Sequence, residues 1–267
     1  MSFFDVHAHL THPKLAPDVP GIVARAAERG VTAIVSNGLN PGDNEAVRAL
    51  AAAYPRIRPA FGFYPVDAVL REMDAMGKSY PREGPTYSAD EGVEWVARNL
   101  GDAFAVGEIG LDGYWVPEEL WAAQETVFRR LVAIAMEADK AVIIHTRKRE
   151  RRALEILLEM GATRVIWHCF GGKVSLGRTI AEHGHYLSIP ANARRSESFS
   201  RLLQTLPRER VLLETDCPYL SPDKERSSEP ADVAGTAAFA AELWNVPIAT
   251  VDAVVTDNFT RIFRAPP

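Results

Sequence analysis

Cysteine and long apolar runs are both scarce in this sequence. Its 267 residues include only two cysteines, Cys169 and Cys217. Two cysteines cannot form a disulfide framework or a cysteine-based zinc site, so any metal must be held by histidine and carboxylate side chains. No apolar run is long enough to span a bilayer, and the first residues lack the pattern of a signal peptide. We therefore expect a soluble, cytoplasmic protein that does not enter a membrane.

An excess of positive charge is also absent. The formal net charge is −5, so the surface as a whole does not favour nucleic acid, and any binding of phosphates must be local. No G-x-G-x-x-G follows the first apolar run, which disfavours a dinucleotide-binding sheet. Neither a low-complexity tract nor a domain boundary interrupts the chain. We therefore expect residues 1–267 to form one domain, and no feature indicates an obligate protein partner.

Short apolar runs recur along the whole sequence and are separated by longer segments of helical period. There are eight such runs: 3–8, 31–37, 57–63, 104–110, 141–146, 164–169, 185–190 and 211–216. Apolar strands that alternate with helices indicate a parallel sheet covered by helices. Eight units in a chain of this length favour a closed (β/α)8 TIM barrel over an open sheet. Residues 232–264 then read as two helices that close the barrel.

One connection is longer than the others. More than forty residues separate the third and fourth expected strands, and residues 77–92 within this connection have the composition of a loop. We interpret residues 77–92 as an insertion near the rim of the barrel. This insertion forms either a lid over the active face or a surface loop without a role in the site.

Imidazole and carboxylate side chains lie at the ends of the expected strands. Six residues have this placement: His7, His9, Glu108, His145, His168 and Asp216. Active sites of such barrels are built at the C-terminal ends of the strands, so these side chains should converge there. Each one alone has an ordinary structural explanation; Asp216, for example, could cap a helix. Together they would repel one another or lack partners without a cation, so the pattern predicts a site for borderline divalent metals.

The other candidates are more ordinary. We expect His183 and His185 to be structural, because they lie before or at the start of the seventh strand. His12 follows the first strand and could approach the site, although a structural role is favoured. Cys169 and Cys217 should point into the packing. Asp5 lies two residues before His7 and therefore points to the same side of the strand. It either orients a metal ligand or is simply a hydrogen-bonded carboxylate of the core, and the two interpretations fit equally well.

Several segments around these residues resemble one family of enzymes. They are F-D-V-H-A-H-L (4–10), G-E-I-G-L-D (107–112), V-I-I-H-T-R (142–147), W-H-C-F-G-G (167–172) and L-E-T-D-C-P-Y-L (213–220), with weaker support from E-P-A-D-V (229–233) and N-F-T-R-I-F (258–263). The chain resembles the TatD family of metal-dependent deoxyribonucleases, which belongs to the amidohydrolase-like barrels. The resemblance extends over essentially the whole sequence.

The resemblance implies two divalent metal ions. One would be held by His7, His9 and Asp216, the other by His145 and His168, with Glu108 bridging the two. Zinc, manganese, cobalt and magnesium all remain open as the metal. Two such ions activate water and polarise the substrate oxygen. We assign Asp216 as both a ligand and the general base.

The sequence departs from the family pattern on the substrate side. Many relatives carry G-x-H-P after the third strand, whereas Tyr64 takes the place of that histidine here. Ser227 and Ser228 stand where many relatives carry an arginine and an asparagine before Glu-Pro. These changes leave the predicted metal ligands complete. They fall among residues that are expected to contact the substrate, so they bear on which substrate is bound.

A basic run, R-K-R-E-R-R at 147–152, directly follows the fifth strand. Positive charge at a helix N-terminus opposes the helix dipole, yet it suits an anionic ligand at the active face. Arg147 is therefore our candidate phosphate clamp, and a solvated patch that pairs with glutamates is favoured for the rest. Tyr114, Trp115 and Tyr219 could stack on bases or simply pack in loops.

Three functions fit these observations. The first is a metal-dependent nuclease that cleaves phosphodiester bonds, acting on DNA from an end or on a single strand. The second keeps the metals but hydrolyses amides, esters or lactones, and it is favoured by the acidic net charge and the altered substrate side. The third is a non-catalytic nucleic-acid-binding protein. This last reading predicts eroded metal ligands, and none of the six is missing.

Overall fold

Eight parallel strands form a single sheet in which each strand pairs with the next one in the sequence. The computed structural model describes residues 1–81 and 84–266. The strands are β1 Phe3–Ala8, β2 Val31–Asn37, β3 Ile57–Phe61, β4 Ala105–Asp112, β5 Ala141–Arg147, β6 Val165–Trp167, β7 Tyr186–Ile189 and β8 Val211–Leu213. A parallel bridge between Ala8 and Cys217 joins the last strand's extension to the first strand. The predicted (β/α)8 TIM barrel is therefore confirmed.

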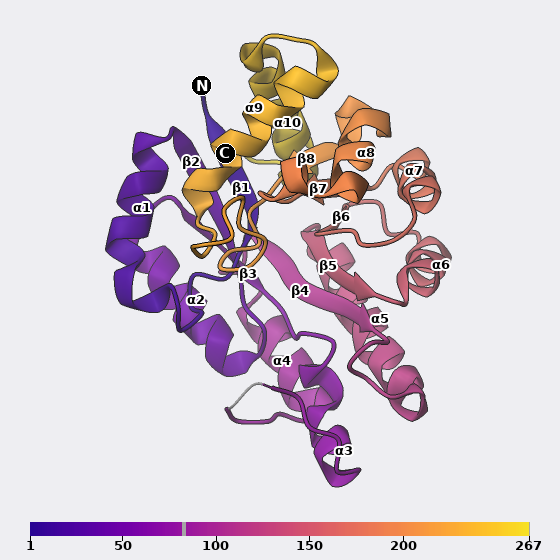
Figure 1. Ribbon diagram of the computed structural model, residues 1–267. Coiled ribbons are helices and arrows are strands. Elements are labelled where there is room, and N and C mark those ends of the chain that lie inside the picture. Colours follow the sequence, from indigo (N-terminus) through magenta and orange to yellow (C-terminus); the bar gives the residue numbers. More distant parts are fainter. Residues whose placement is uncertain (82–83, 267) are drawn as a thin grey trace.

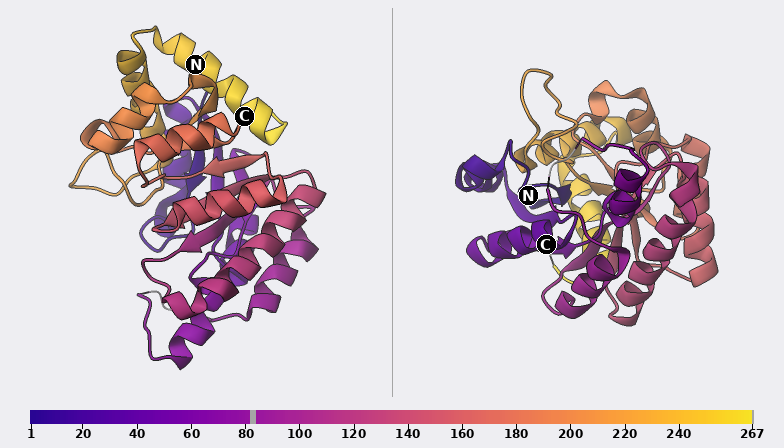
Figure 2. Two further views of the ribbon diagram at one scale, coloured as in Figure 1. Left: turned by 90° about the vertical axis from the view of Figure 1, so that its right-hand side faces the viewer. Right: turned by 90° about the horizontal axis from the view of Figure 1, so that it is seen from below.

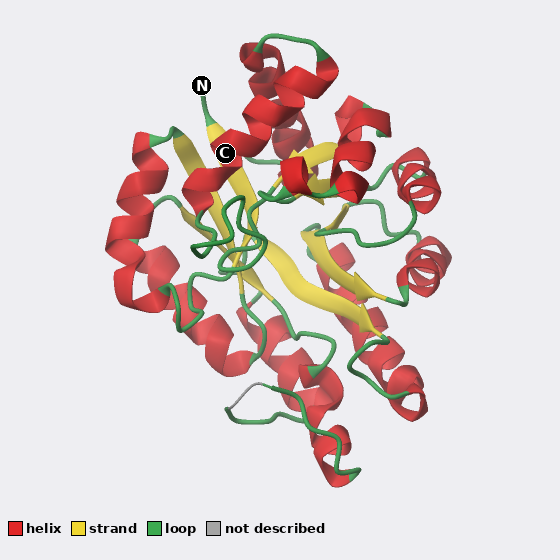
Figure 3. Cartoon of the chain, in the orientation of Figure 1, coloured by secondary structure: helices red, strands yellow, loops and turns green. Residues whose placement is uncertain are grey.

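Helices surround the strands (Figures 1 and 3). They are α1 Val19–Glu28, α2 Pro41–Ala53, α3 Leu70–Ala75, α4 Ala89–Asn99, α5 Trp121–Glu137, α6 Glu150–Met160, α7 Val174–Glu182, α8 Glu197–Thr205, α9 Val233–Trp244 and α10 Ile248–Phe263. Helix α6 shows why they form. It buries Leu154, Ile156 and Leu157 on one face and ends at Gly161, whose φ of 71° provides the left-handed C-cap.

The predicted helices of residues 232–264 are present as α9 and α10. Phe259 of α10 lies 4.5 Å from the ring of Phe4 at the start of β1, and Phe263 lies 4.8 Å from Phe104, just before β4. The Asn258 amide donates to the carbonyl of Val211, the first residue of β8. Helix α10 thus covers the N-terminal end of the barrel, and the chain's first residues lie beside it in all views (Figures 1 and 2).

The described residues contain no single helix that is long and apolar enough to cross a membrane. Only the segments Pro230–Trp244 and Ile248–Phe263 taken together reach that length and composition, and a bend of 112° separates them.

The expected loop at 77–92 is partly wrong. Residues 89–92 belong to α4, because the Ser88 hydroxyl accepts from the Glu91 amide at 3.2 Å and the Glu91 carboxylate accepts from the Ser88 amide at 2.6 Å. This reciprocal capping box starts the helix. Residues 82–83 of the expected insertion lie outside the described residues. Tyr80 packs its ring 5.2 Å from that of Trp115, so this part of the excursion contacts the segment that follows β4.

Candidate metal centre

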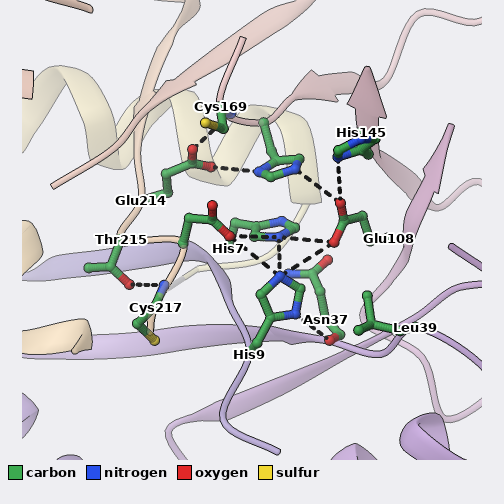
Figure 4. Close-up of polar contacts among 12 residues, drawn as sticks. His7, His9, Asn37, Leu39, Glu108, His145, Cys169, Glu214, Thr215 and Cys217 are labelled. Carbon is green, nitrogen blue, oxygen red and sulfur yellow. Dashed lines mark hydrogen bonds and ion pairs between the residues drawn. The ribbon is translucent and has the colours of Figure 1, made fainter. Parts of the chain in front are cut away.

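The structure brings all six predicted side chains together at the C-terminal end of the barrel. Figure 4 shows the cluster, with Glu108 between His145 and the pair His7 and His9. The side chains come from β1, β4 and β5 and from the segments directly after β1, β6 and β8. For three of these residues, the predicted end of the strand differs from the observed one. Glu108 lies in the middle of β4, which continues to Asp112, whereas β6 and β8 end before His168 and Asp216.

The two carboxylate oxygens of Glu108 face two different pairs of imidazoles. Oε1 lies 3.1 Å from Nδ1 of His145 and 3.1 Å from Nε2 of His168. Oε2 lies 3.4 Å from Nε2 of His7 and 3.4 Å from Nε2 of His9. A carboxylate placed between two sets of nitrogen ligands in this way has the arrangement required of a bridging ligand.

Asp216 completes the set around the first pair. Its Oδ1 lies 3.4 Å from Nε2 of His9 and 3.7 Å from Nε2 of His7, and the two Nε2 atoms are 3.1 Å apart. The backbone holds this position, because the Asp216 amide donates to the His7 carbonyl at 2.9 Å. The loop after β8 is thereby tied to β1, which is also where the barrel closes.

These residues fit a divalent metal. Two triplets, His7–His9–Asp216 and His7–Glu108–His168, each place their ligand atoms within 4.8 Å of one another. Imidazole nitrogen and carboxylate oxygen are the donors that zinc, manganese and cobalt accept. The first triplet is the one expected for the first ion. In the second, His7 rather than His145 joins Glu108 and His168, although His145 is equally close to Glu108 Oε1.

The electrostatics of the cluster favour positive charge at its centre. Burial raises the pKa of the Glu108 carboxyl, but His168, His145 and His7 lower it more strongly, and the net pKa lies well below the usual value. Burial lowers the pKa of His168, but Glu108 raises it more strongly, and the net pKa lies well above the usual value. A buried carboxylate surrounded by imidazoles thus stabilises any cation placed among them.

Two carboxylates that the sequence reasoning missed support the histidines. Asp112 places its Oδ2 3.0 Å from Nε2 of His145, on the ring edge opposite Glu108. Glu214 places its Oε2 3.8 Å from Nδ1 of His168 and accepts from the Cys169 amide at 2.8 Å. A ring nitrogen paired with a carboxylate orients the other nitrogen towards a metal.

Tyr64 contacts the centre from β3's side. Its hydroxyl lies 3.4 Å from Nε2 of His145, and the two rings are 4.9 Å apart. Tyr64 also hydrogen-bonds with Tyr80 from the excursion before α4. Burial and the nearby charges of Glu108 and Asp112 raise the pKa of Tyr64 well above its usual value, so the hydroxyl keeps its proton. The side chain is therefore a neutral donor beside the cluster.

Arg147 ends β5 at the edge of the cluster and is exposed. Its guanidinium lies 3.7 Å from the ring centroid of Tyr114, and within the described chain no carboxylate pairs with it. In the rest of the basic run, Arg151 is exposed and Arg152 pairs with Glu125 and Glu155, in agreement with the expected patch. Arg149 is buried against Trp121 and pairs with Glu125, so it is not solvated as expected.

Comparison with known proteins identifies the family of this chain. The sequence model of the family described as TatD related DNase matches residues 4–264. The chain belongs to this family. The metal-dependent hydrolase YabD of Bacillus subtilis, itself uncharacterized, is 32% identical over 98% of both chains. Human deoxyribonuclease TATDN3 is 27% identical over 97% of this chain and 93% of its own. The crystal structure of YjjV, a TatD homolog from Escherichia coli, superposes with a TM-score of 0.84 at 23% identity, covers 99% of this chain and 98% of its own, and so shows the shared fold.

The remaining histidines of this TatD-family chain lie outside the cluster. His185 is buried, accepts from the Trp167 indole at 3.1 Å and donates to the Ala162 carbonyl at 2.9 Å, which is the structural role we expected. His183 is exposed at the end of α7. His12 packs its ring 5.5 Å from that of Tyr219.

Asp5 and the two cysteines have structural surroundings. Asp5 accepts from the Thr215 amide at 2.9 Å and from the His7 amide at 3.2 Å, so it joins β1 to the segment after β8. It contacts the His7 backbone rather than the His7 ring, which favours satisfaction in the core over orientation of the imidazole. Cys217 is fully buried and Cys169 is partly buried. Burial raises the pKa of both thiols well above the usual value.

Proposed function

We propose that this chain is a divalent-metal-dependent nuclease that cleaves phosphodiester bonds in DNA, acting on single strands or at strand ends. The position of Glu108 between two pairs of imidazoles carries the proposal, because it provides for two cations side by side. Nucleases and phosphatases use such pairs to stabilise both oxygens of an in-line displacement. The name of the human relative, a deoxyribonuclease, agrees with this choice of substrate.

The residues divide into two ligand sets. His7, His9 and Asp216 would hold one ion and His145 and His168 the other, with Glu108 shared. When bound, the ions supply activated water and neutralise charge that develops on the phosphate oxygens. Asp112 keeps the ring of His145 turned towards the centre, and Glu214 lies 3.8 Å from Nδ1 of His168 on the side away from Glu108.

Asp216 is the proposed general base. Burial raises the pKa of Asp216, but its contact with His9 and the charges of the neighbouring imidazoles lower the pKa further, and the net value lies below the usual one. The carboxylate is therefore ionised at neutral pH. It takes the proton of the attacking water as the new O–P bond forms and the bond from phosphorus to the leaving oxygen breaks.

Arg147 and Tyr64 are the proposed substrate contacts. The Arg147 guanidinium already packs on the Tyr114 ring, so binding a phosphate costs it little side-chain entropy. The Tyr64 hydroxyl lies 3.4 Å from Nε2 of His145, keeps its proton and can donate to a substrate oxygen. Tyr114 is 49% exposed, and Arg147 and Lys148 both lie over its ring.

A comparison of two substrates with one leaving group tests the proposal. Metal-loaded protein would be assayed on bis-p-nitrophenyl phosphate and on p-nitrophenyl acetate, with the release of nitrophenol as the common signal. We expect kcat/KM to be higher for the phosphodiester. Higher kcat/KM for the acetate would favour the acyl hydrolase. Turnover of neither substrate by protein that holds two ions would favour the non-catalytic reading.

A further inference from the structure

A large cavity lies outside the metal centre. Its volume is about 550 Å³, which is within the range of cavities that hold small ligands. Its walls are α1, the first half of α9 and the segments that follow β7 and β8. None of the six residues of the metal centre lines it. Because parallel barrel strands end on one face, the segments after β7 and β8 leave the barrel at the end where the metal centre lies.

Guanidinium groups dominate this cavity. Its charged lining consists of five arginines and three carboxylates: Arg25, Arg29, Arg194, Arg195 and Arg226, with Glu28, Glu229 and Asp232. The excess of positive charge is notable in a chain whose formal net charge is −5. We call it the arginine cavity.

Three of the arginines are fixed by carboxylates. Arg25 pairs with Glu229 at 2.7 Å, which joins α1 to the segment after β8. Arg226 pairs with Asp232 through two nitrogens, and Arg194 pairs with Glu242 at 2.6 Å. These pairs hold the cavity walls in place. Because each of these three arginines is neutralised by its carboxylate, they contribute little net charge to the binding of a ligand.

The other two arginines supply free positive charge, and Glu28 is a lining carboxylate that no arginine of the described residues pairs with, so the free charge of the lining is one positive unit. Within residues 1–81 and 84–266 no carboxylate pairs with Arg29 or Arg195, and both are exposed. Arg195 donates one hydrogen bond from Nη1 to the Pro222 carbonyl at 3.1 Å, which aims its guanidinium while the other donors stay available. A planar guanidinium with available donors binds phosphate oxygens in pairs.

The floor of the cavity is apolar. Phe239 lies under the Arg194 guanidinium at 4.5 Å, and Ala191 and Pro222 line the wall beside it. Gly235, at the third position of the twelve-residue helix α9, is exposed and leaves the floor without a side chain. A ligand that suits both the guanidinium groups and the apolar floor carries a phosphate group and a flat apolar body.

We propose that the arginine cavity binds a nucleotide, with the phosphate on Arg195 and the base against Gly235 and the Arg194 guanidinium that covers Phe239. The choice of a nucleotide among phosphorylated ligands rests on the proposed nuclease function, whereas the phosphate site rests on the cavity alone. The nucleotide is either a unit of the bound strand or a free nucleoside monophosphate.

Calorimetric titration with 5′-dAMP and, separately, with inorganic phosphate tests the site. Arg195→Ala should weaken dAMP binding at least tenfold, and Gly235→Leu should do the same by filling the floor. A Cβ at Gly235 meets no heavy atom within 4 Å, so the leucine variant should fold. Arg201→Ala is the control, since Arg201 is an exposed arginine of α8 that pairs with Glu197 outside the cavity. Equal dAMP affinity in wild type, Arg195→Ala and Gly235→Leu would overturn the proposal.

Two further measurements separate the outcomes. Hydrogen exchange with dAMP bound should protect residues 191–195 and 222–239, whereas protection confined to residues around His145 would contradict the site. In kinetics, Gly235→Leu should raise KM for an oligonucleotide but not for bis-p-nitrophenyl phosphate if the cavity holds a unit of the strand. An unchanged KM with lost dAMP binding would assign the cavity to the free nucleotide. Phosphate binding that depends on Arg195 in a protein that cleaves no DNA would retain the anion site and reject the nuclease function.

Discussion

Oδ2 of Asp112 lies 3.0 Å from Nε2 of His145, and this contact decides which ring nitrogen faces the metal centre. With Nε2 taken by Asp112, Nδ1 is directed at Glu108, 3.1 Å away. Such a carboxylate fixes the orientation of a metal-binding imidazole and increases its basicity. The pair makes Asp112 part of the centre although it is not itself among the proposed ligands.

Replacing the Asp112 carboxylate should therefore weaken the binding of the metal. Asp112→Asn should lower metal affinity by about 10–100-fold, because an amide cannot match the charge that orients His145. Titration against a competing chelator measures this affinity. Asp257→Asn, at an exposed position on α10, is the matched control and should leave affinity unchanged. Wild-type affinity in Asp112→Asn would show that the contact does not support the centre.

A second prediction concerns the bridging position of Glu108. Glu108→Gln keeps the volume of the side chain but removes the charge shared by two pairs of imidazoles. Metal content, measured by elemental analysis after dialysis, should fall from two ions per chain to one or fewer. Two tightly bound ions in the variant would contradict the bridging role.

Arg147 should act through binding rather than through chemistry. Arg147→Ala should raise KM for DNA by about tenfold, equivalent to roughly 1.4 kcal/mol, and change kcat little. Arg151→Ala, an exposed arginine of the same basic run, serves as the control. A neutral aryl ester provides the second comparison. An equal loss on that ester would show that Arg147 supports the structure instead of the phosphate.

His185 should make stability depend on pH. Burial lowers the pKa of His185 to about 4 in the folded protein, below the unfolded value of about 6.5. The unfolded chain then binds more protons between these values, so the contribution is complete above pH 6.5 and is lost as the pH falls towards 4. The full difference is on the order of 3 kcal/mol. Urea unfolding at pH 7 and pH 4.5 should show a smaller pH-dependent loss for His185→Gln than for wild type. An identical loss would contradict a neutral buried His185.

The fold was predictable because its signals are local and repeated. Both faces of the strands are buried, so strands such as β1 and β2 appear as continuous apolar runs whose bounds the sequence gives correctly. The short strands β6 and β8 were overestimated, because the chain beyond them stays largely buried but makes only scattered backbone hydrogen bonds to the neighbouring strands instead of a continuous ladder. The helix at 89–92 was missed because a loop-like composition concealed the capping box of Ser88 and Glu91.

The convergence of the six site residues followed from strand position alone, whereas their supports did not. Asp112 shares strand parity with Glu108, and this signal could have placed it on the same face. Glu214 shares parity with Asp216 but lies deeper. Its role depends on contacts with His168 and Cys169, whose segments are distant in sequence. The arginine cavity likewise joins α1, α9 and two loops, and no local pattern brings these together.

The most direct test of the account is hydrolysis of 5′-labelled single-stranded DNA by metal-stripped protein that is re-supplied in turn with Mg²⁺, Mn²⁺, Co²⁺ and Zn²⁺. Cleavage should return with at least one metal in the wild type. It should fall by a factor of about 10²–10⁴ in Asp216→Asn, which lacks the proposed base, and the product ladder would show whether ends are preferred. Absence of cleavage with every metal, in protein shown to bind two ions, would contradict the proposed nuclease function.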